Sequence, residues 1–408
     1  MSRRSLTRFV ALAAIVSLFG TCGAFAPAQA AEQVIKIGTE LPTSGGDASN
    51  GIPTQNGAQL AVDEANLHAP AGFRFQLDPL DDAVGGIHNP QQGATNIRSL
   101  AADAAVMGVV GPFNSNVAAA EIPVSNETGL PLISPSNTNP TLTKTSKYRT
   151  SHPSEITYFR VCATDDVQGK AGAQFAKQLG FKKVYIIDDN ETYGLGLANV
   201  FDADFKSEGG SVLGHDHVTA NQQDFKALLT KVSATHPDAI YYGGVTVTGG
   251  GLIRQQMGSS GMDPTKVPFE GGDGISDDEF LKVAGPAANN SYYTVAAPDA
   301  EKSASAQAFI KAYKAKFHSD IGAYSANGYV AAQVIIGAVD KAIKENGGKA
   351  PTRAQVLKTI QSTKDFKSII GSFGFDKNGD TTSPVISLWK INGGKQVFVR
   401  QINVSAGG

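Results

Sequence analysis

The chain has 408 residues, with 35 Lys and Arg against 37 Asp and Glu, so its formal net charge is −2. That length suffices for two ordinary domains. The near-neutral balance gives no chain-wide basic field, which makes nucleic acid a poor candidate partner. The 45 Gly and 19 Pro form no long biased tract, so the composition indicates a globular α/β protein and argues against disorder.

The first 30 residues have the three parts of a secretory signal. Three arginines form a basic head, residues 9–19 are apolar, and Ala28-Gln29-Ala30 offers a cleavage site. The apolar run is shorter than the roughly 20 residues that a transmembrane helix needs. We therefore expect a protein exported through a cleaved signal peptide that does not span the membrane. Lipid anchoring at Cys22 is the alternative, which Thr21 disfavours because a small residue usually precedes a lipidated cysteine.

From residue 34 onward, short β-rich runs alternate with amphipathic segments of helical period. The predicted strands cover residues 34–41, 73–80, 105–110, 131–134, 158–163, 184–188, 211–218, 239–242 and 291–296. The predicted helices cover residues 55–67, 90–102, 117–127, 167–179, 197–207, 224–235, 252–257, 304–317, 326–345 and 352–361. This rhythm predicts doubly wound parallel sheets with right-handed crossovers. Near the end it gives way to a hairpin, residues 385–391 and 397–402 around Asn392-Gly393.

The sequence carries no motif for catalysis. A G-x-S-x-G elbow, an H-E-x-x-H helix, a phosphate-binding loop and a C-x-x-C pair are all missing, so we expect no catalytic residues and no cofactor. His215-Asp216-His217 places two imidazoles on one face of a strand, which is how a zinc site could begin. Because no third ligand is evident near them in the sequence, we predict a solvated strand surface and no metal. Cys162 is predicted to be a small buried strand residue.

Polar and aromatic side chains gather in loops that we expect at the ends of strands. These loops are residues 44–51, 111–116, 134–140, 188–194, 241–244 and 270–274. Ligands of parallel α/β sheets bind at the carboxyl ends of the strands, so a binding site is expected there. Around Asn114 to Val117 such a loop enters a helix whose first N–H groups suit a carboxylate. Ordinary N-capping by Asn114, Ser115 or Asn116 is the alternative use of the same residues.

The sequence resembles the leucine/isoleucine/valine-binding proteins, a class of periplasmic solute receptors that serve ABC importers. The resemblance runs from Ile35-Lys36-Ile37-Gly38, through Asn56-Gly57-Ala58, to Ile370-Gly371 and Phe375-Asp376. Its most specific block is Pro131-Leu132-Ile133-Ser134-Pro135, followed by Asn139-Pro140 and Leu142-Thr143. Asp189 to Gly194 and Tyr241 to Gly244 also lie where this family places them.

The resemblance implies a type I periplasmic binding protein fold, with two doubly wound Rossmann-like lobes of parallel sheets joined by a three-segment hinge. The implied N-terminal lobe comprises residues 31–158 and 297–370, and the C-terminal lobe comprises residues 159–296 and 371–408. The three crossings are expected near Tyr158, near Ala296 and near Gly371. The implied protein is a monomer and not an enzyme. It would capture an amino acid in the cleft between the lobes and deliver it to the permease of an ABC importer.

Carried over by position, the resemblance implies a set of ligand-binding residues. The ligand carboxylate would bind at Ser115 and at the backbone near Thr138, and the ammonium at the Ser136 carbonyl, the Thr138 hydroxyl and Asp273. Three residues correspond to the family's pocket aromatics, namely Tyr193, Tyr242 and Tyr324. Asn50 and Asn114 depart from the branched-chain pattern, and Asp273 is one methylene shorter than the family's Glu, so the pocket looks more polar than a leucine site.

Three alternatives to an amino-acid receptor stay open. A receptor for short amides, urea or aromatic acids would use the same fold, with Asp273 accepting amide N–H groups. A secreted enzyme would need a nucleophile and a base within reach of each other, and the sequence offers no such pair. A ligand-sensing regulator would need an output segment, which this sequence does not show.

Overall fold

The computed structural model describes residues 32–403 and contains two large sheets. The first sheet is formed by strands from the N-terminal part of the chain. Its five strands are all parallel and lie in the order β2-β1-β5-β6-β7. They are β1 (Gln33–Leu41), β2 (Phe73–Asp81), β5 (Val106–Val110), β6 (Leu132–Ser134) and β7 (Tyr158–Arg160). The predicted secretory signal and Cys22 lie outside the described residues.

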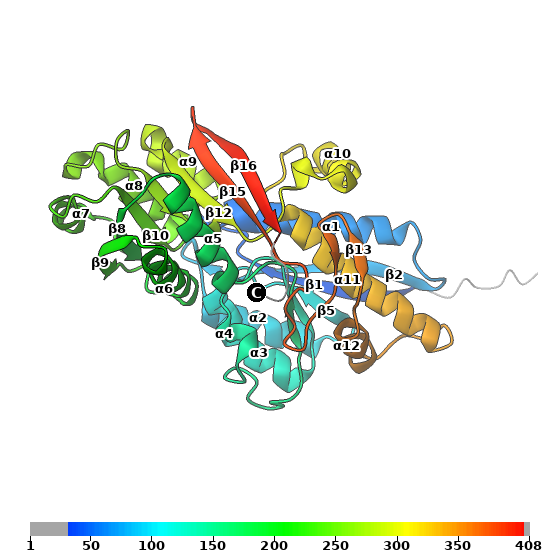
Figure 1. Ribbon diagram of the computed structural model, residues 1–408. Helices are drawn as coiled ribbons and strands as arrows, with labels where there is room; N and C mark the ends of the chain where they lie inside the picture. The colour runs from blue at the N-terminus through cyan, green and yellow to red at the C-terminus, as the bar shows by residue number, and fades with distance from the viewer. Residues whose placement is uncertain (1–31, 404–408) are drawn as a thin grey trace, which may run out of the picture.

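Seven helices and two small hairpins belong with this sheet and form the first lobe (Figure 1). The helices are α1 (Ala48–Asn66), α2 (Pro90–Ala102), α3 (Ser115–Thr128), α4 (Thr141–Lys144), α10 (Gln307–Phe317), α11 (Ser325–Glu345) and α12 (Arg353–Gln361). The hairpins pair β3 (Ala83–Val84) with β4 (Ile87–His88) and β13 (Phe366–Ser368) with β14 (Gly371–Phe373). Helix α1 packs closely on α11, because Gly57 and Gly328 have no side chain to separate the two backbones.

The second lobe is built on a seven-stranded sheet in the order β16-β15-β12-β11-β10-β8-β9. Its strands are β8 (Lys183–Asp188), β9 (Ser211–His217), β10 (Ala239–Gly243), β11 (Phe269–Gly271), β12 (Ser291–Val295), β15 (Val385–Asn392) and β16 (Lys395–Asn403). The first five are parallel, and the predicted terminal hairpin β15-β16 is antiparallel. The helices are α5 (Asp165–Gln178), α6 (Thr192–Ser207), α7 (Lys226–Ser233), α8 (Gly251–Gln256) and α9 (Asp278–Ala284).

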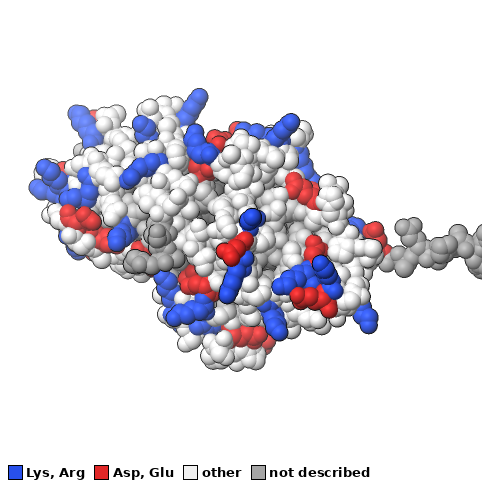
Figure 2. All heavy atoms as spheres, turned by 45° about the vertical axis from the view of Figure 1, so that its right-hand side comes forward, with Lys and Arg blue, Asp and Glu red and all other residues white. Residues whose placement is uncertain are grey.

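The two sheets with their helices confirm the predicted type I periplasmic binding protein fold. Each lobe has its own apolar core, one around Ile35, Ile37 and Val330 and another around Ile187, Ile240 and Tyr293. Within residues 32–403, no helix combines the length and the apolar character needed to cross a bilayer. On the face shown in Figure 2, positive and negative side chains are intermixed, in keeping with the small net charge.

The chain passes between the lobes after β7, after β12 and before β15. The first two passages adjoin each other, since the Ala163 N–H donates to the Ala296 carbonyl over 3.0 Å. Phe373 and Phe375 still pack in the first core, so the last passage lies beyond Gly371, between Phe375 and Val385. The exact lobe boundaries stay a prediction.

A buried ion pair joins the first and last of these passages. Arg160 Nε donates to Asp380 Oδ1 over 2.6 Å, and both side chains are almost completely buried. The same guanidinium donates to the backbone carbonyls of Asn137 and Asn139, each over 2.9 Å. Cys162, two residues further along, is buried as predicted, although it follows β7 and does not lie within it. Arg160 therefore ties the hinge to the loop that follows β6.

Candidate functional site

A small cavity lies between the lobes, where the carboxyl ends of strands from both sheets meet. Its walls come from the loops after β1, β5 and β6 on one side and after β8, β10 and β11 on the other. The lining residues are Asp47, Asn50, Phe113, Asn114, Ser115, Ser136, Tyr193, Val245, Asp273 and Gly274. The cavity leaves about 20 Å³ of free space, enough for about one water molecule.

Six of the nine predicted binding residues line this cavity, four from the first lobe and two from the second. They are Asn50, Asn114, Ser115, Ser136, Tyr193 and Asp273. Parallel sheets explain the convergence, because every strand of such a sheet delivers its following loop to the same edge. Asp47, Phe113, Val245 and Gly274 complete the lining and were not predicted as binding residues.

Asp273 is the acidic group that the second lobe contributes. Its side chain is buried, and Oδ1 accepts hydrogen bonds from Gln168 Nε2 over 2.5 Å and from the Tyr193 hydroxyl over 3.1 Å. Burial raises the pKa of Asp273, while the Gln168 and Tyr193 hydrogen bonds act in the opposite direction. A ligand cation beside this carboxylate would lower its pKa again and replace the hydration that burial removes.

Within residues 32–403, the loops of the first lobe hold buried polar side-chain atoms without hydrogen-bond partners; Asn114 lines the cavity, and Thr138 does not. Among the described residues, Asn114 Oδ1 and Thr138 Oγ1 are buried and make no hydrogen bond. Asn114 is the N-cap residue of α3, yet its side chain makes no capping hydrogen bond, so the predicted capping use of Asn114 is wrong. Buried polar atoms are normally paired, and each unpaired one costs about 1–3 kcal/mol. A polar ligand would satisfy such atoms.

The other predicted residues lie next to the cavity or away from it. Tyr324 is buried and packs edge-on against the lining residue Phe113, with ring centroids 5.7 Å apart. Tyr242 lies in the core of the second lobe, where its hydroxyl is 3.3 Å from both the Val245 carbonyl and the Thr248 hydroxyl. Tyr242 therefore supports the wall of the cavity behind Val245 and is not among the residues that line it in the described part of the chain.

A histidine that the sequence did not single out bridges the two lobes at the rim of the cavity. His88 Nδ1 lies 2.8 Å from Asp47 Oδ2 in the first lobe, and Nε2 lies 2.8 Å from Glu191 Oε2 in the second. Burial alone would lower the pKa of His88, but the two carboxylates outweigh it and hold that pKa well above its ordinary value. The ring is therefore a buried imidazolium that donates to both acids.

Further hydrogen bonds cross between the lobes beside this bridge. Asn116 Nδ2 donates to Glu191 Oε2 over 3.1 Å, and Asn139 Nδ2 donates to the Thr192 carbonyl over 2.6 Å. On the opposite rim, Asn50 Nδ2 donates to Asp277 Oδ2 over 2.9 Å. Direct contacts on both sides of the cavity show that the structure is the closed arrangement of the lobes. No sequence signal identifies these pairs, since each forms only when the lobes meet.

The prediction that no third ligand lies near His215 and His217 in the second lobe was wrong. The sequence seemed to offer no third ligand near His215 and His217, but Asp188 on the neighbouring strand β8 contacts both rings. The sequence signal that would have found Asp188 is the pair of predicted strands, residues 184–188 and 211–218. Parallel pairing of these two neighbours sets their last residues side by side.

The chain matches known proteins over nearly its whole length. The model of the family described as periplasmic binding protein matches residues 34–395. The Leu/Ile/Val-binding protein BraC3 of Rhizobium johnstonii is 33% identical over 379 residues, which are 92% of this chain and 95% of that protein.

Two solved structures share the fold at moderate identity. The branched-chain amino acid transporter substrate binding protein LivJ of Streptococcus pneumoniae, in complex with isoleucine, superposes with a TM-score of 0.78 and 29% identity. That match covers 91% of this chain and 99% of the LivJ chain. The leucine binding protein LivK of Thermotoga maritima also gives a TM-score of 0.78, with 27% identity over 90% of this chain and 99% of its own.

Proposed function

Because the chain belongs to the periplasmic binding protein family, we propose that it is an extracytoplasmic receptor that captures an amino acid between its lobes. The ligand class is taken from the similar proteins named above, whose names specify leucine, isoleucine and valine. In this proposal the receptor works in the periplasm as a monomer and delivers the ligand to the permease of an ABC importer. It makes and breaks no bond in its ligand.

The observation that carries the proposal is the arrangement of opposite polar groups around one cavity. Asp273, from the second lobe, is a buried carboxylate suited to an ammonium group. Ser115, the first residue of α3, lines the same cavity from the first lobe, where a hydroxyl and the helix N-terminus suit a carboxylate. A zwitterion that leaves water needs both kinds of partner, since an unpaired buried charge is costly.

The side-chain end of the cavity suggests a ligand that is branched-chain or somewhat more polar. Phe113 and Val245 supply apolar contact surface, while Asn50 and Asn114 add amide groups. Asn50 already donates to Asp277 across the cleft, so the closed form holds its amide in a fixed orientation. An amide, urea or aromatic acid is the alternative ligand, with Asp273 accepting N–H groups in the first two cases.

Calorimetric titration of Asp273→Asn tests the proposal. The wild-type protein is titrated with leucine, isoleucine, valine and smaller amino acids, then with urea, acetamide and benzoate. We expect wild-type binding to an amino acid and a loss of roughly 2–4 kcal/mol in the variant, because a buried charge loses its partner. Glu279→Gln, which removes an acid paired with Lys282 on the surface of α9, is the matched control and should bind normally.

Three results, two from these titrations and one from an assay for turnover, would redirect the proposal. Unchanged affinity in Asp273→Asn removes Asp273 from the site. Binding of urea, acetamide or benzoate with no amino-acid binding favours the alternative receptor. Release of ammonia from amino-acid amides would show turnover and contradict a purely binding role.

A further inference from the structure

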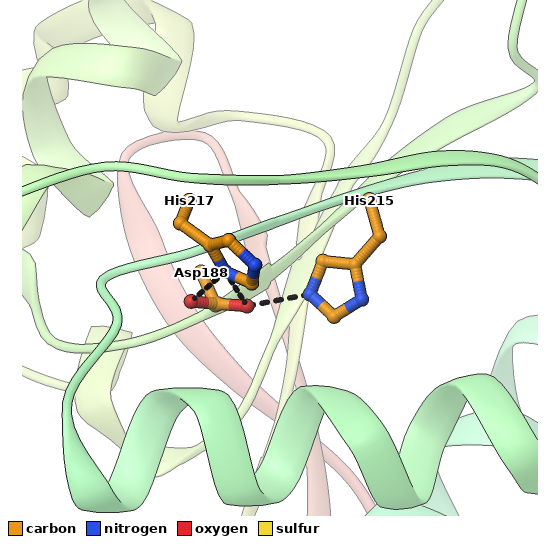
Figure 3. A group of neighbouring side chains, drawn as sticks. All are labelled: Asp188, His215 and His217. Carbon is orange, nitrogen blue, oxygen red and sulfur yellow. Dashed lines mark hydrogen bonds and ion pairs between the residues drawn. The ribbon is translucent and has the colours of Figure 1, made fainter.

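We propose that Asp188, His215 and His217 form a binding site for one divalent transition-metal ion, with zinc as the best match. The three side chains converge at one edge of the second sheet, as Figure 3 shows. One carboxylate oxygen and one ring nitrogen from each histidine all lie within 4.8 Å of one another. This site lies apart from the cavity residues and adds a metal to the properties proposed above.

The strand geometry fixes the three ligands in one place. His215 and His217 are two residues apart on β9, so both side chains project from the same face. Parallel pairing sets Asp188 directly opposite His217, at the carboxyl end of both strands. Asp216, between the histidines, points the other way and bonds to the Tyr185 hydroxyl and Lys231. The convergence therefore follows from the register of two strands and does not depend on a flexible loop.

The donor atoms and their distances suit a metal ion. His215 Nε2 lies 2.5 Å from Asp188 Oδ2, and His217 Nδ1 lies 2.8 Å from both carboxylate oxygens. Zinc bonds of about 2.0–2.2 Å in tetrahedral geometry would need these atoms to separate by several tenths of an ångström. The His217 side chain is about half exposed, at 49%, so it has room to make that adjustment.

The surroundings of the site select the kind of ion. Two imidazole nitrogens with one carboxylate favour zinc, nickel or copper, whereas calcium and magnesium prefer all-oxygen ligand sets. Asp188 is fully buried, and its Oδ1 also accepts the Asn190 N–H over 2.7 Å, which orients the carboxylate. The exposed side of His217 leaves a fourth position for water. Three residues after Asp188, Glu191 reaches His88 across the cleft, so the metal would anchor the strand end from which that loop departs.

Titration of zinc chloride into tag-free, metal-stripped protein tests the site. We expect one equivalent to bind with a dissociation constant in the micromolar range or tighter, and calcium or magnesium not to compete. The double variant His215→Gln/His217→Gln should lose at least a factor of ten in zinc affinity. The double variant His68→Gln/His152→Gln, which removes two exposed histidines of the first lobe, should bind zinc like wild type.

Cobalt absorbance gives a second readout that does not depend on the folding of a variant. Wild-type protein loaded with cobalt should show the intense visible bands of a four-coordinate ion, and one equivalent of zinc should bleach them. No zinc binding by the wild-type protein would overturn the proposal. So would full zinc affinity in the variant that lacks both strand histidines.

Discussion

Two buried ion pairs, one in the hinge and one at the rim of the cleft, differ in what they hold together. Arg160 and Asp380 join two passages of the chain that pack on the same lobe. His88 and Glu191 join opposite lobes, so their contact exists only while the cleft is closed. The hinge pair therefore contributes to the stability of the fold, whereas the rim pair contributes to closure and, through closure, to ligand affinity.

Removing the hinge cation should have the largest effect. Arg160→Met leaves Asp380 buried without its charge partner, and we expect the free energy of unfolding to fall by about 3–5 kcal/mol. Urea denaturation followed by circular dichroism measures this loss. The double variant Arg160→Met/Asp380→Leu should recover much of it, because no buried charge remains unpaired. A loss below about 1 kcal/mol in the single variant would show that the pair does not support the fold.

Removing the rim cation should affect ligand affinity more than stability. In His88→Gln the closed form loses a charged hydrogen bond to Glu191, which is worth about 1.5–3 kcal/mol, so the dissociation constant should rise at least tenfold. The open form does not contain this contact. A double-mutant cycle with Glu191→Gln should give a coupling energy of the same sign. Strictly additive effects on affinity would mean that the two residues do not cooperate in closure.

The rim pair also predicts how affinity depends on pH. Asp47 and Glu191 raise the pKa of His88 in the closed form against the effect of burial, and Asp82 and Asp189 lie within range of its charge. In the open form the pKa lies nearer the ordinary value of about 6.5. Closing therefore takes up a proton between these two pKa values. Affinity should be constant below about pH 6.5 and fall as the pH rises through the raised pKa.

Calorimetry across a pH series checks this sign, with His88→Gln as the control. The variant should lose the part of the pH dependence that comes from the imidazole, and other buried groups account for the remainder. A steeper fall in the variant than in the wild type would contradict the assignment.

Glu121 is a buried acid without a cation beside it in the described part of the chain, and replacing it should give the smallest change in the free energy of unfolding. Glu121 is fully buried, and burial together with the neighbouring Glu40 and Asp82 raises its pKa well above the usual range. A raised pKa means that stability is lost as the pH climbs through it, because the folded state must then release a buried proton. Glu121→Gln should change the free energy of unfolding by less than about 1 kcal/mol at pH 5 and stabilise the protein at pH 9. Destabilisation that grows with pH would contradict this.

The sequence predicts the alternation of strands and helices well, and it fails where tertiary contacts override local preference. Helix α1 begins at Ala48, whereas the prediction placed its start at residue 55. The prediction missed the first turns because they contain Gly51 and Pro53, which are typical of loops. Tyr313 and Ser325 donate hydrogen bonds to the Pro53 carbonyl and hold that turn in place. Residues 270 and 271 of strand β11 fall in the loop predicted over residues 270–274, where Gly271 and Gly272 are typical of loops.

The sequence predicts those parts of the candidate site that belong to a single loop, and it misses the contacts that form between the two lobes. Asn114 and Ser136 each follow a predicted strand, so their convergence follows from the parallel fold, whereas Asp273 follows β11, which lies outside the predicted strands. His88 and Glu191 depend on how far the lobes close, which no local pattern encodes. Tyr242 belongs to a strand whose side chains pack in the core of the second lobe, which the carry-over by position does not reveal.

Calorimetric titration of the wild-type protein with leucine and two analogues that each lack one charge shows whether the closed lobes bind both charges of the ligand. Leucinamide lacks the carboxylate that we assign to Ser115 and α3, and N-acetyl-leucine lacks the ammonium that we assign to Asp273. We expect leucine to bind and each analogue to bind at least a hundredfold more weakly. Binding of either analogue as tightly as leucine would show that the lobes do not close on both charges of the ligand.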